Sequence, residues 1–135
     1  MATCIGVCAH GNLSKALVEA MGMIAGVPEG IEAFPLLPGM DPFEYRAEIA
    51  AFVDAHETDD VLLLVDLFGG TPSNMCASLA RREGVEVVAG VNLAMLIEVA
   101  TMKNQMGLGE LRDLALSCGA ESLVDVRACL ASRRG

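Results

Sequence analysis

The sequence contains no long hydrophobic run. The apolar stretches of this 135-residue chain are short and interrupted, and none reaches the roughly 18 residues that a membrane-spanning helix requires. The first residues, MATCIGVCAHG, lack the basic start and the longer apolar segment of a secretory signal peptide. These absences argue against a membrane-spanning or secreted protein. We therefore expect a cytoplasmic protein with no direct membrane insertion.

Basic residues and histidines are also scarce. The chain has 9 Lys and Arg residues against 18 Asp and Glu residues, which gives a formal net charge of −9. Such a chain repels the phosphate backbone of nucleic acids and anionic lipid surfaces, so we expect neither as a partner. Only His10 and His56 are available for imidazole chemistry. We interpret His56, which lies beside Glu57, as a surface histidine.

The five cysteines form no C-x-x-C pair, and their number is odd. Cys4 and Cys8 are expected on one side of an extended segment, the same side as His10, and a metal site would also produce this pattern. Small buried thiols in a reducing compartment explain it more simply. We favour that interpretation and predict no metal site and no cofactor.

Short apolar runs alternate with segments of helical periodicity. The runs typical of buried strands occupy residues 3–9, 31–37, 61–65 and 85–91. Each run precedes a segment with apolar residues at helical spacing, and the capping residues expected for these helices are Asn12, Asp41, Thr71 and Asn92. A final helix is predicted over about residues 109–132, with one apolar face that continues to Cys129.

This alternation predicts parallel strands joined by right-handed crossovers. Near-continuous apolar strands are covered on both faces, and Pro35 confines its strand to an edge. We predict a single domain over residues 1–135 with an α/β fold. It is a small open sandwich with a mostly parallel four-stranded sheet, order 2-1-3-4, and helices on both faces. Ligands bind such sheets beyond the carboxyl ends of the strands, where the strand order reverses, here between the first and third strands.

Polar residues end both strands that flank this reversal point. His10 ends the first strand, whereas Asp66 ends the third and precedes the loop Leu67-Phe68-Gly69-Gly70-Thr71-Pro72. A neutral imidazole attacks a phosphoryl group well when its other ring nitrogen donates a proton to an orienting acceptor. A carboxylate serves as such an acceptor in catalytic triads. We therefore predict that His10 and Asp66 form the catalytic pair.

The glycine loop supplies groups that suit a phosphate. Gly69 and Gly70 leave room for backbone N–H groups to face a phosphate, and Thr71 adds a hydroxyl. Two helices also present their positive ends at this place. The loops contain no Lys or Arg, which fits a phosphocarrier better than an enzyme that holds ATP. The motifs of P-loop kinases, dinucleotide-binding folds and serine hydrolases are absent.

Three stretches together indicate a family. They are IGVCAHGNLSKAL (5–17), VLLLVDLFGGTPSNMCASLA (61–80) and VVAGVNLAMLIEVA (87–100). With them the sequence resembles the IIA component of the mannose (mannose/fructose/sorbose) family of the bacterial phosphoenolpyruvate-dependent sugar phosphotransferase system. The second stretch carries most of the resemblance, because VDLFGGTPSN reads like a family signature. In the family, a small residue and a Thr or Ser usually precede the active histidine. Cys8 and Ala9 replace this pair here.

The resemblance implies a phosphotransferase with a phosphohistidine intermediate. His10 would accept a phosphoryl group from the phosphocarrier HPr and pass it to a IIB component during sugar uptake, with Asp66 orienting the ring. Gly70 and Thr71 would line the phosphoryl pocket together with residues 38–39. Family members are commonly homodimers, so we expect a homodimer here.

The pocket and docking residues that we expect beyond the catalytic pair lie in two loops. The loop residues of the phosphoryl pocket are Pro38 and Gly39, and the apolar centre of the HPr docking surface is predicted at Met40 and Phe68. Two other functions stay open. One is a stand-alone regulatory protein in which phosphorylated His10 is a signal. The other is a flavodoxin-like protein that binds a phosphate-containing ligand without a covalent bond.

Overall fold

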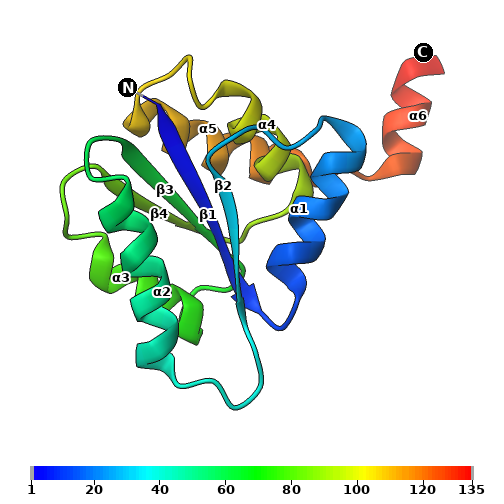
Figure 1. The fold of residues 1–135 in the computed structure, drawn as a ribbon. Helices are drawn as coiled ribbons and strands as arrows, with labels where there is room; N and C mark the ends of the chain where they lie inside the picture. The colour runs from blue at the N-terminus through cyan, green and yellow to red at the C-terminus, as the bar shows by residue number, and fades with distance from the viewer. Residues whose placement is uncertain (1, 135) are drawn as a thin grey trace.

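The computed structural model describes residues 2–134, and a four-stranded sheet lies at its centre (Figure 1). The strands are β1 (Thr3–His10), β2 (Ile31–Leu36), β3 (Asp60–Val65) and β4 (Val85–Ala89). They lie in the order β2-β1-β3-β4, and each pair of neighbours runs parallel. The predicted sheet order is confirmed, and Pro35 lies in the edge strand β2 as its missing N–H requires.

Helices cover both faces of the sheet (Figure 1). The helices α2 (Pro42–Ala55) and α3 (Thr71–Leu79) pack on one face, and α1 (Leu13–Ile24), α4 (Leu93–Met102) and α5 (Leu108–Glu121) pack on the other. Side chains alternate between these two cores along each strand. In β3, for example, Leu63 and Val65 join the core under α2 and α3, whereas Leu62 and Leu64 join the opposite core.

The same alternation brings the cysteines of β1 to a common face. Cys4 and Cys8 are both buried in the core under α2 and α3. His10 follows Cys8 by two residues, and it lies at the exposed carboxyl end of the strand. Within residues 2–134 no helix is long and apolar enough to cross a lipid bilayer.

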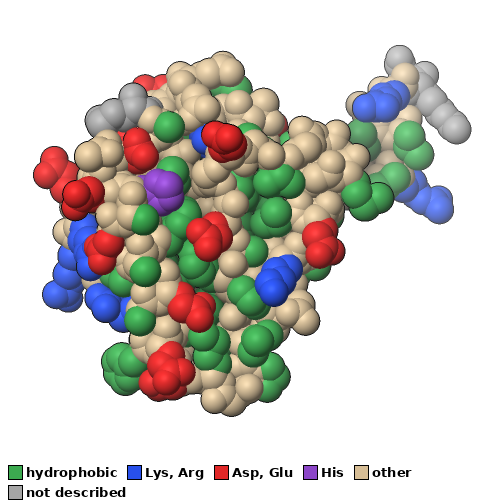
Figure 2. Space-filling model, in the orientation of Figure 1, with side chains coloured by type: hydrophobic (Ala, Val, Ile, Leu, Met, Phe, Trp, Pro, Cys, Tyr) green, Lys and Arg blue, Asp and Glu red, His purple; other side chains and the backbone are tan. Residues whose placement is uncertain are grey.

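The C-terminal segment differs from the prediction of one continuous helix. The helix α5 ends at Glu121, and a separate helix, α6 (Val126–Arg134), follows. The Asp125 side chain accepts a hydrogen bond of 3.2 Å from Ala128 N, so it offers the backbone a new helix start. α6 projects away from the body of the molecule (Figures 1 and 2). Cys129 therefore does not continue the apolar face of α5.

The helix starts follow the sequence signals only in part. Asn92 caps α4 as predicted, because its Oδ1 atom accepts a hydrogen bond of 2.9 Å from Met95 N. Asn12 and Asp41 precede α1 and α2 but form no capping hydrogen bond through their side chains. The N-cap of α3 is Gly70 and not Thr71, which is the first helical residue. The Thr71 side chain therefore does not cap α3.

Candidate active site

The carboxyl ends of β1 and β3 bring an imidazole and a carboxylate together. The two strands are neighbours in parallel register, with Cys8 opposite Val65, so the residues that follow them meet at one edge of the sheet. The Nδ1 atom of His10 lies 2.8 Å from Oδ2 of Asp66. The backbone N–H of His10 donates to the same oxygen over 3.0 Å. The structure therefore brings the two predicted catalytic residues into direct contact.

This contact decides which ring nitrogen is available for reaction. A carboxylate accepts hydrogen bonds, so Nδ1 of His10 carries the proton and Nε2 keeps a free lone pair. The His10 side chain is 49% exposed, whereas the Asp66 side chain is only 12% exposed. Burial alone raises the pKa of Asp66, but the hydrogen bonds from the backbone and ring of His10 outweigh it and hold the pKa below its usual value. Asp66 is therefore a stable anion at neutral pH.

A hollow of about 330 Å³ opens beside the His10 ring. The end of β1 forms one side of it, and the segment between β2 and α2 forms another. The residues that line it are His10, Gly11, Leu36, Leu37, Pro38, Gly39, Met40, Pro42 and Thr71. Its volume is at the lower end of the range for ligand pockets, and it adjoins a side chain half exposed to solvent. A small group carried by the His10 ring would border this space.

Gly70 lies directly against the His10 ring. A Cβ atom at Gly70 would lie 2.8 Å from Cε1 and 3.4 Å from Nε2 of His10, and the first distance is shorter than real Cβ contacts. The backbone of Gly70 has φ −78° and ψ 171°, which any residue adopts. Glycine is thus required here by the close approach of the imidazole and not by the backbone conformation.

The start of α3 offers unpaired backbone donors to this place. The first hydrogen bond of that helix runs from Asn74 N to Gly70 O, so the N–H groups of Thr71 and Ser73 have no acceptor within the helix. Such groups and the positive end of the helix dipole attract an anion. Within the part of the chain that the structure describes, no Lys or Arg lines the hollow. Backbone donors and a hydroxyl therefore supply the local positive potential.

The sequence and the fold of this chain both match known proteins. Residues 5–116 match the family model described as PTS system fructose IIA component, where PTS is the sugar phosphotransferase system. The chain belongs to this family. It is therefore a IIA component of the sugar phosphotransferase system, and the resemblance found in the three sequence stretches is confirmed.

Relatives and solved structures of IIA proteins agree with this assignment. The chain is 38% identical over 104 residues to the fructose-specific EIIA component of Bacillus subtilis strain 168, covering 76% of this chain and 71% of the relative. It is 33% identical over 103 residues to the sorbose-specific EIIA component of Lacticaseibacillus casei, covering 76% and 75%. The crystal structure of the phosphotransferase system component EIIA from Streptococcus agalactiae superposes with a TM-score of 0.87 at 27% identity, covering 94% and 99%.

Most of the remaining predicted site residues of this IIA chain lie around the hollow. Pro38, Gly39, Met40 and Thr71 all line it together with His10. Gly69 does not line it. Gly69 has φ +87°, a conformation that favours glycine, and it shapes the turn that brings the next residue against the ring. The predicted roles of these residues in binding phosphate stay predictions.

Exposed apolar side chains lie on the two segments next to the hollow. Phe68 is 86% exposed, although it is a large aromatic residue. Leu67 beside it is exposed as well, and so are Leu37 between β2 and α2 and Phe43 in the first turn of α2. Exposed apolar side chains that gather at one place are typical of a protein-binding surface. The predicted docking residue Phe68 belongs to this group, whereas Met40 is partly buried.

Several residues of the hollow were not predicted from the sequence. Gly11, Leu36, Leu37 and Pro42 line it but were not predicted as site residues. The β1–β2 register explains their position, because His10 pairs with Leu36 across the two strands. Parallel pairing of the first and second strands was predicted, so the residues that follow the second strand could have been assigned to the pocket by their register alone.

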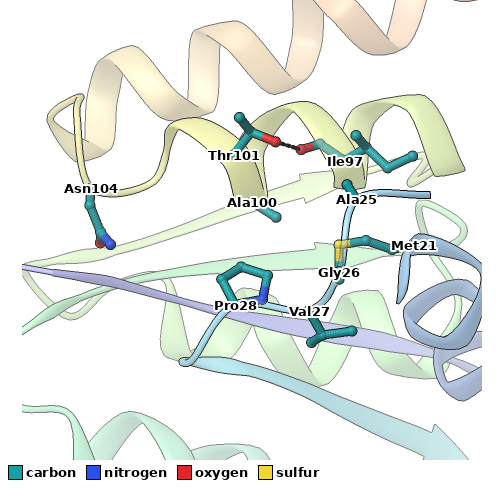
Figure 3. A pocket seen from close by; sticks show the side chains of 9 residues that line it. All are labelled: Met21, Ala25, Gly26, Val27, Pro28, Ile97, Ala100, Thr101 and Asn104. Carbon is teal, nitrogen blue, oxygen red and sulfur yellow. Dashed lines mark hydrogen bonds between the residues drawn. The ribbon is translucent and has the colours of Figure 1, made fainter. Parts of the chain in front are cut away.

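A second hollow, of about 420 Å³, lies between the carboxyl end of α1 and α4 (Figure 3). Apolar residues such as Met21, Val27 and Ile97 dominate its lining. The Thr101 hydroxyl in it already donates to Ile97 O over 2.8 Å. His10 and Asp66 do not line this hollow, because His10 precedes the opposite end of α1. We therefore assign it no part in phosphoryl chemistry.

Proposed function

We propose that this chain is a phosphocarrier. In this proposal His10 accepts a phosphoryl group from HPr and passes it to a IIB component during sugar uptake. The observation that carries the proposal is the 2.8 Å contact between Nδ1 of His10 and Oδ2 of Asp66, which leaves Nε2 free on a half-exposed ring. Membership of the IIA family supports the same role. Residues 1–135 would act as one IIA domain.

The chemistry is a phosphoryl exchange between two histidines. The Nε2 lone pair of His10 attacks the phosphorus of phosphorylated HPr, so a P–N bond forms on this chain while the P–N bond of the donor breaks. Both nitrogens of the His10 ring are then substituted, and the ring carries positive charge. The anionic Asp66 stabilises this charge through its hydrogen bond to Nδ1–H. No proton has to leave the ring. The acceptor can therefore attack the phosphorus in the same direct way, and the P–N bond to His10 then breaks.

The pocket would hold the phosphoryl oxygens by backbone donors. The unpaired N–H groups of Thr71 and Ser73 at the start of α3 are suited to this, and the Thr71 side chain lines the same hollow. A transferring phosphoryl group spreads charge over its oxygens, and positioning together with charge stabilisation supplies most of the catalysis. A pocket without a lysine or arginine binds the phosphoryl group moderately, as a carrier that must release it requires.

The exposed apolar surface supports protein partners in this proposal. HPr and the IIB component would use the apolar loops that flank His10, with Phe68 and Met40 at the centre of contact. We also propose a cytoplasmic homodimer. The exposed apolar side chains of α6, including Val126 and Leu130, support self-association (Figure 2). A regulatory role would use the same phosphorylated His10, so the fate of the phosphoryl group separates transport from signalling.

The test is phosphorylation in a reconstituted system. The chain is incubated with enzyme I, HPr and radiolabelled phosphoenolpyruvate, and the label is analysed for acid lability and base stability. We expect one such label per chain, absent in His10→Ala and present in the control His56→Ala. Addition of a IIB component should remove the label. If the wild-type chain acquires no label, the phosphocarrier proposal is wrong and non-covalent ligand binding becomes the better account.

A further inference from the structure

Three potential metal ligands meet at the end of the sheet opposite His10. Cys4 lies near the start of β1, His56 directly follows α2, and Asp59 directly precedes β3. These strands run parallel, so their starts lie at the same edge. The turn between α2 and β3 is closed by a hydrogen bond of 2.9 Å from Asp59 N to His56 O. The turn therefore holds an imidazole and a carboxylate over the thiol.

Two of the three distances between the ligand atoms match a tetrahedral metal site. The Nδ1 atom of His56 lies 3.3 Å from Sγ of Cys4 and 3.6 Å from Oδ2 of Asp59. All three ligand atoms lie within 4.8 Å of one another. Tetrahedral Zn²⁺ with bonds of roughly 2.0–2.3 Å separates its nitrogen, oxygen and sulphur ligands by about 3.3–3.6 Å. Small side-chain movements would therefore suffice to bind the ion.

We propose that Cys4, His56 and Asp59 form a Zn²⁺ site with one position open to an exogenous ligand. Three protein ligands with an open fourth position are a recurrent arrangement for zinc, and one sulphur, one nitrogen and one oxygen donor are all ligands it accepts. This proposal departs from the sequence prediction that the chain has no metal site. It does not depend on the phosphocarrier function, because His10 and Asp66 lie at the other end of the sheet.

The surroundings hold the ligands in place and leave the site accessible. The ring of Phe52 packs edge-on against the imidazole of His56, with ring centres 4.9 Å apart. Cys4 is only 5% exposed, whereas the side chains of His56 and Asp59 are 32% and 31% exposed. All three line a hollow of about 280 Å³ that also contains Glu29 and Lys103. An ion can therefore enter from solvent, with a water molecule as its fourth ligand.

Hydrogen bonding within the cluster serves only one contact of the imidazole at a time. His56 Nδ1 either donates one hydrogen or accepts one, yet it faces both the Cys4 thiol and the Asp59 carboxylate. A divalent cation satisfies all three groups at once. Lys103 is the cationic neighbour, but its ammonium group is already held by Thr3 O at 3.1 Å and by Asn104 Oδ1 at 3.3 Å. It therefore borders the site without replacing the metal ion.

Binding must replace the thiol proton. Burial raises the pKa of Cys4, Asp59 raises it further, and Lys103 lowers it. The step is therefore Cys4–SH plus Zn²⁺ giving Cys4–S–Zn⁺ plus a proton released to solvent, with no change of oxidation state. Proton release makes the affinity rise with pH across the neutral range. The groups that face the thiol are His56, Asp59 and Lys103, with Glu29 further along the hollow.

The experiment measures Zn²⁺ binding by titration calorimetry and Co²⁺ binding by absorption. The wild-type chain should bind one Zn²⁺, and its Co²⁺ form should show a thiolate-to-cobalt charge-transfer band and the intense visible bands of tetrahedral cobalt. Cys4→Ser, His56→Gln and Asp59→Asn should each lower the affinity more than the about 10- to 100-fold caused by loss of a second-shell partner. The matched controls Cys129→Ser and Asp60→Asn should bind as the wild type does.

Two further controls keep the outcome decisive. His10→Gln should retain full metal binding, and phosphorylation of His10 should be unchanged in Asp59→Asn. Circular dichroism establishes that each variant is folded. If Cys4→Ser fails to fold, the cobalt spectrum of the wild type and the partly exposed Asp59 variant carry the test. The proposal would be overturned if the wild type showed no thiolate-to-cobalt band. It would also be overturned if binding survived in the folded ligand variants, or if binding were lost in His10→Gln.

Discussion

The Oδ2 atom of Asp66 accepts two hydrogen bonds from His10, one of 2.8 Å from the ring and one of 3.0 Å from the backbone N–H. A single carboxylate oxygen thus fixes both the imidazole and the main chain that carries it. The two residues are 56 positions apart in the sequence, and the parallel pairing of β1 and β3 brings them together. The proposed phosphoryl transfer depends on this contact, since it engages Nδ1 and leaves Nε2 free.

The first prediction concerns Asp66→Ala. Without the carboxylate, Nδ1 of His10 loses its acceptor and the ring populates both tautomers and other orientations. Phosphorylation by phosphorylated HPr should slow by at least about 10-fold, because the ring is no longer held in the reactive tautomer. Rapid-quench measurement of the phosphorylation rate checks this. Asp113→Ala on the surface of α5 is the control, and equal rates in the two variants would remove the orienting role of Asp66.

The second prediction concerns the close approach at Gly70. In Gly70→Ala the new methyl group would lie 2.8 Å from Cε1 of His10, so the ring must move away from Asp66. We expect a folded protein with strongly reduced phosphorylation. Gly107→Ala is a matched control, because Gly107 is also a helix N-cap with an extended backbone and a Cβ there meets nothing within 4 Å. Reduced phosphorylation in both variants would point to a general effect of the substitution.

The third prediction concerns the Thr71 hydroxyl. Thr71→Ala removes a hydroxyl donor from the hollow, and the phosphorylated form should lose about 1–3 kcal/mol of stabilisation, as expected for a hydrogen bond to a charged group. The equilibrium of phosphoryl exchange with HPr reports this loss directly. Thr71→Ser keeps the hydroxyl and should retain most of the stabilisation. An unchanged exchange equilibrium in Thr71→Ala would show that the hydroxyl does not meet the phosphoryl group.

The fourth prediction concerns docking. The double variant Met40→Ala, Phe68→Ala should raise the KM for phosphorylated HPr with little effect on the maximal rate, because it removes apolar contact and leaves His10 and Asp66 in place. Met23→Ala is the control, since Met23 is a highly exposed methionine near the end of α1. Steady-state kinetics with varied HPr concentration separates the two parameters. An unchanged KM in the double variant would exclude these residues as the centre of the surface.

The sequence predicted the order of the sheet and the meeting of His10 with Asp66, because local patterns encode both. Alternating strand and helix signals allow few topologies, and the order β2-β1-β3-β4 places the ends of the first and third strands together. His10 and Asp66 were therefore assigned to one site without knowledge of any distance. Asn92 was also predicted correctly as a cap. Its hydrogen bond reaches only three residues along the chain, to Met95 N, so the local sequence suffices to predict it.

Features that depend on distant contacts or on competing local signals were not predicted. The apolar spacing of α5 continues past Glu121 with no Gly or Pro, yet Asp125 starts a new helix. His56 was interpreted as a surface histidine, but it is half-buried and meets Cys4, which is 52 positions away in the sequence. The loop between α2 and β3 carries no pattern that indicates this contact. Only the folded chain brings the two residues together.

The position of the phosphoryl group on the imidazole tests the central claim most directly. Two-dimensional NMR of the protein, labelled on its histidine nitrogens and phosphorylated through enzyme I and HPr, distinguishes substitution at Nε2 from substitution at Nδ1. Since Nδ1 of His10 is bound to Asp66, the account predicts phosphorylation at Nε2, with the Nδ1 proton retained. Phosphorylation at Nδ1, or at a residue other than His10, would contradict it.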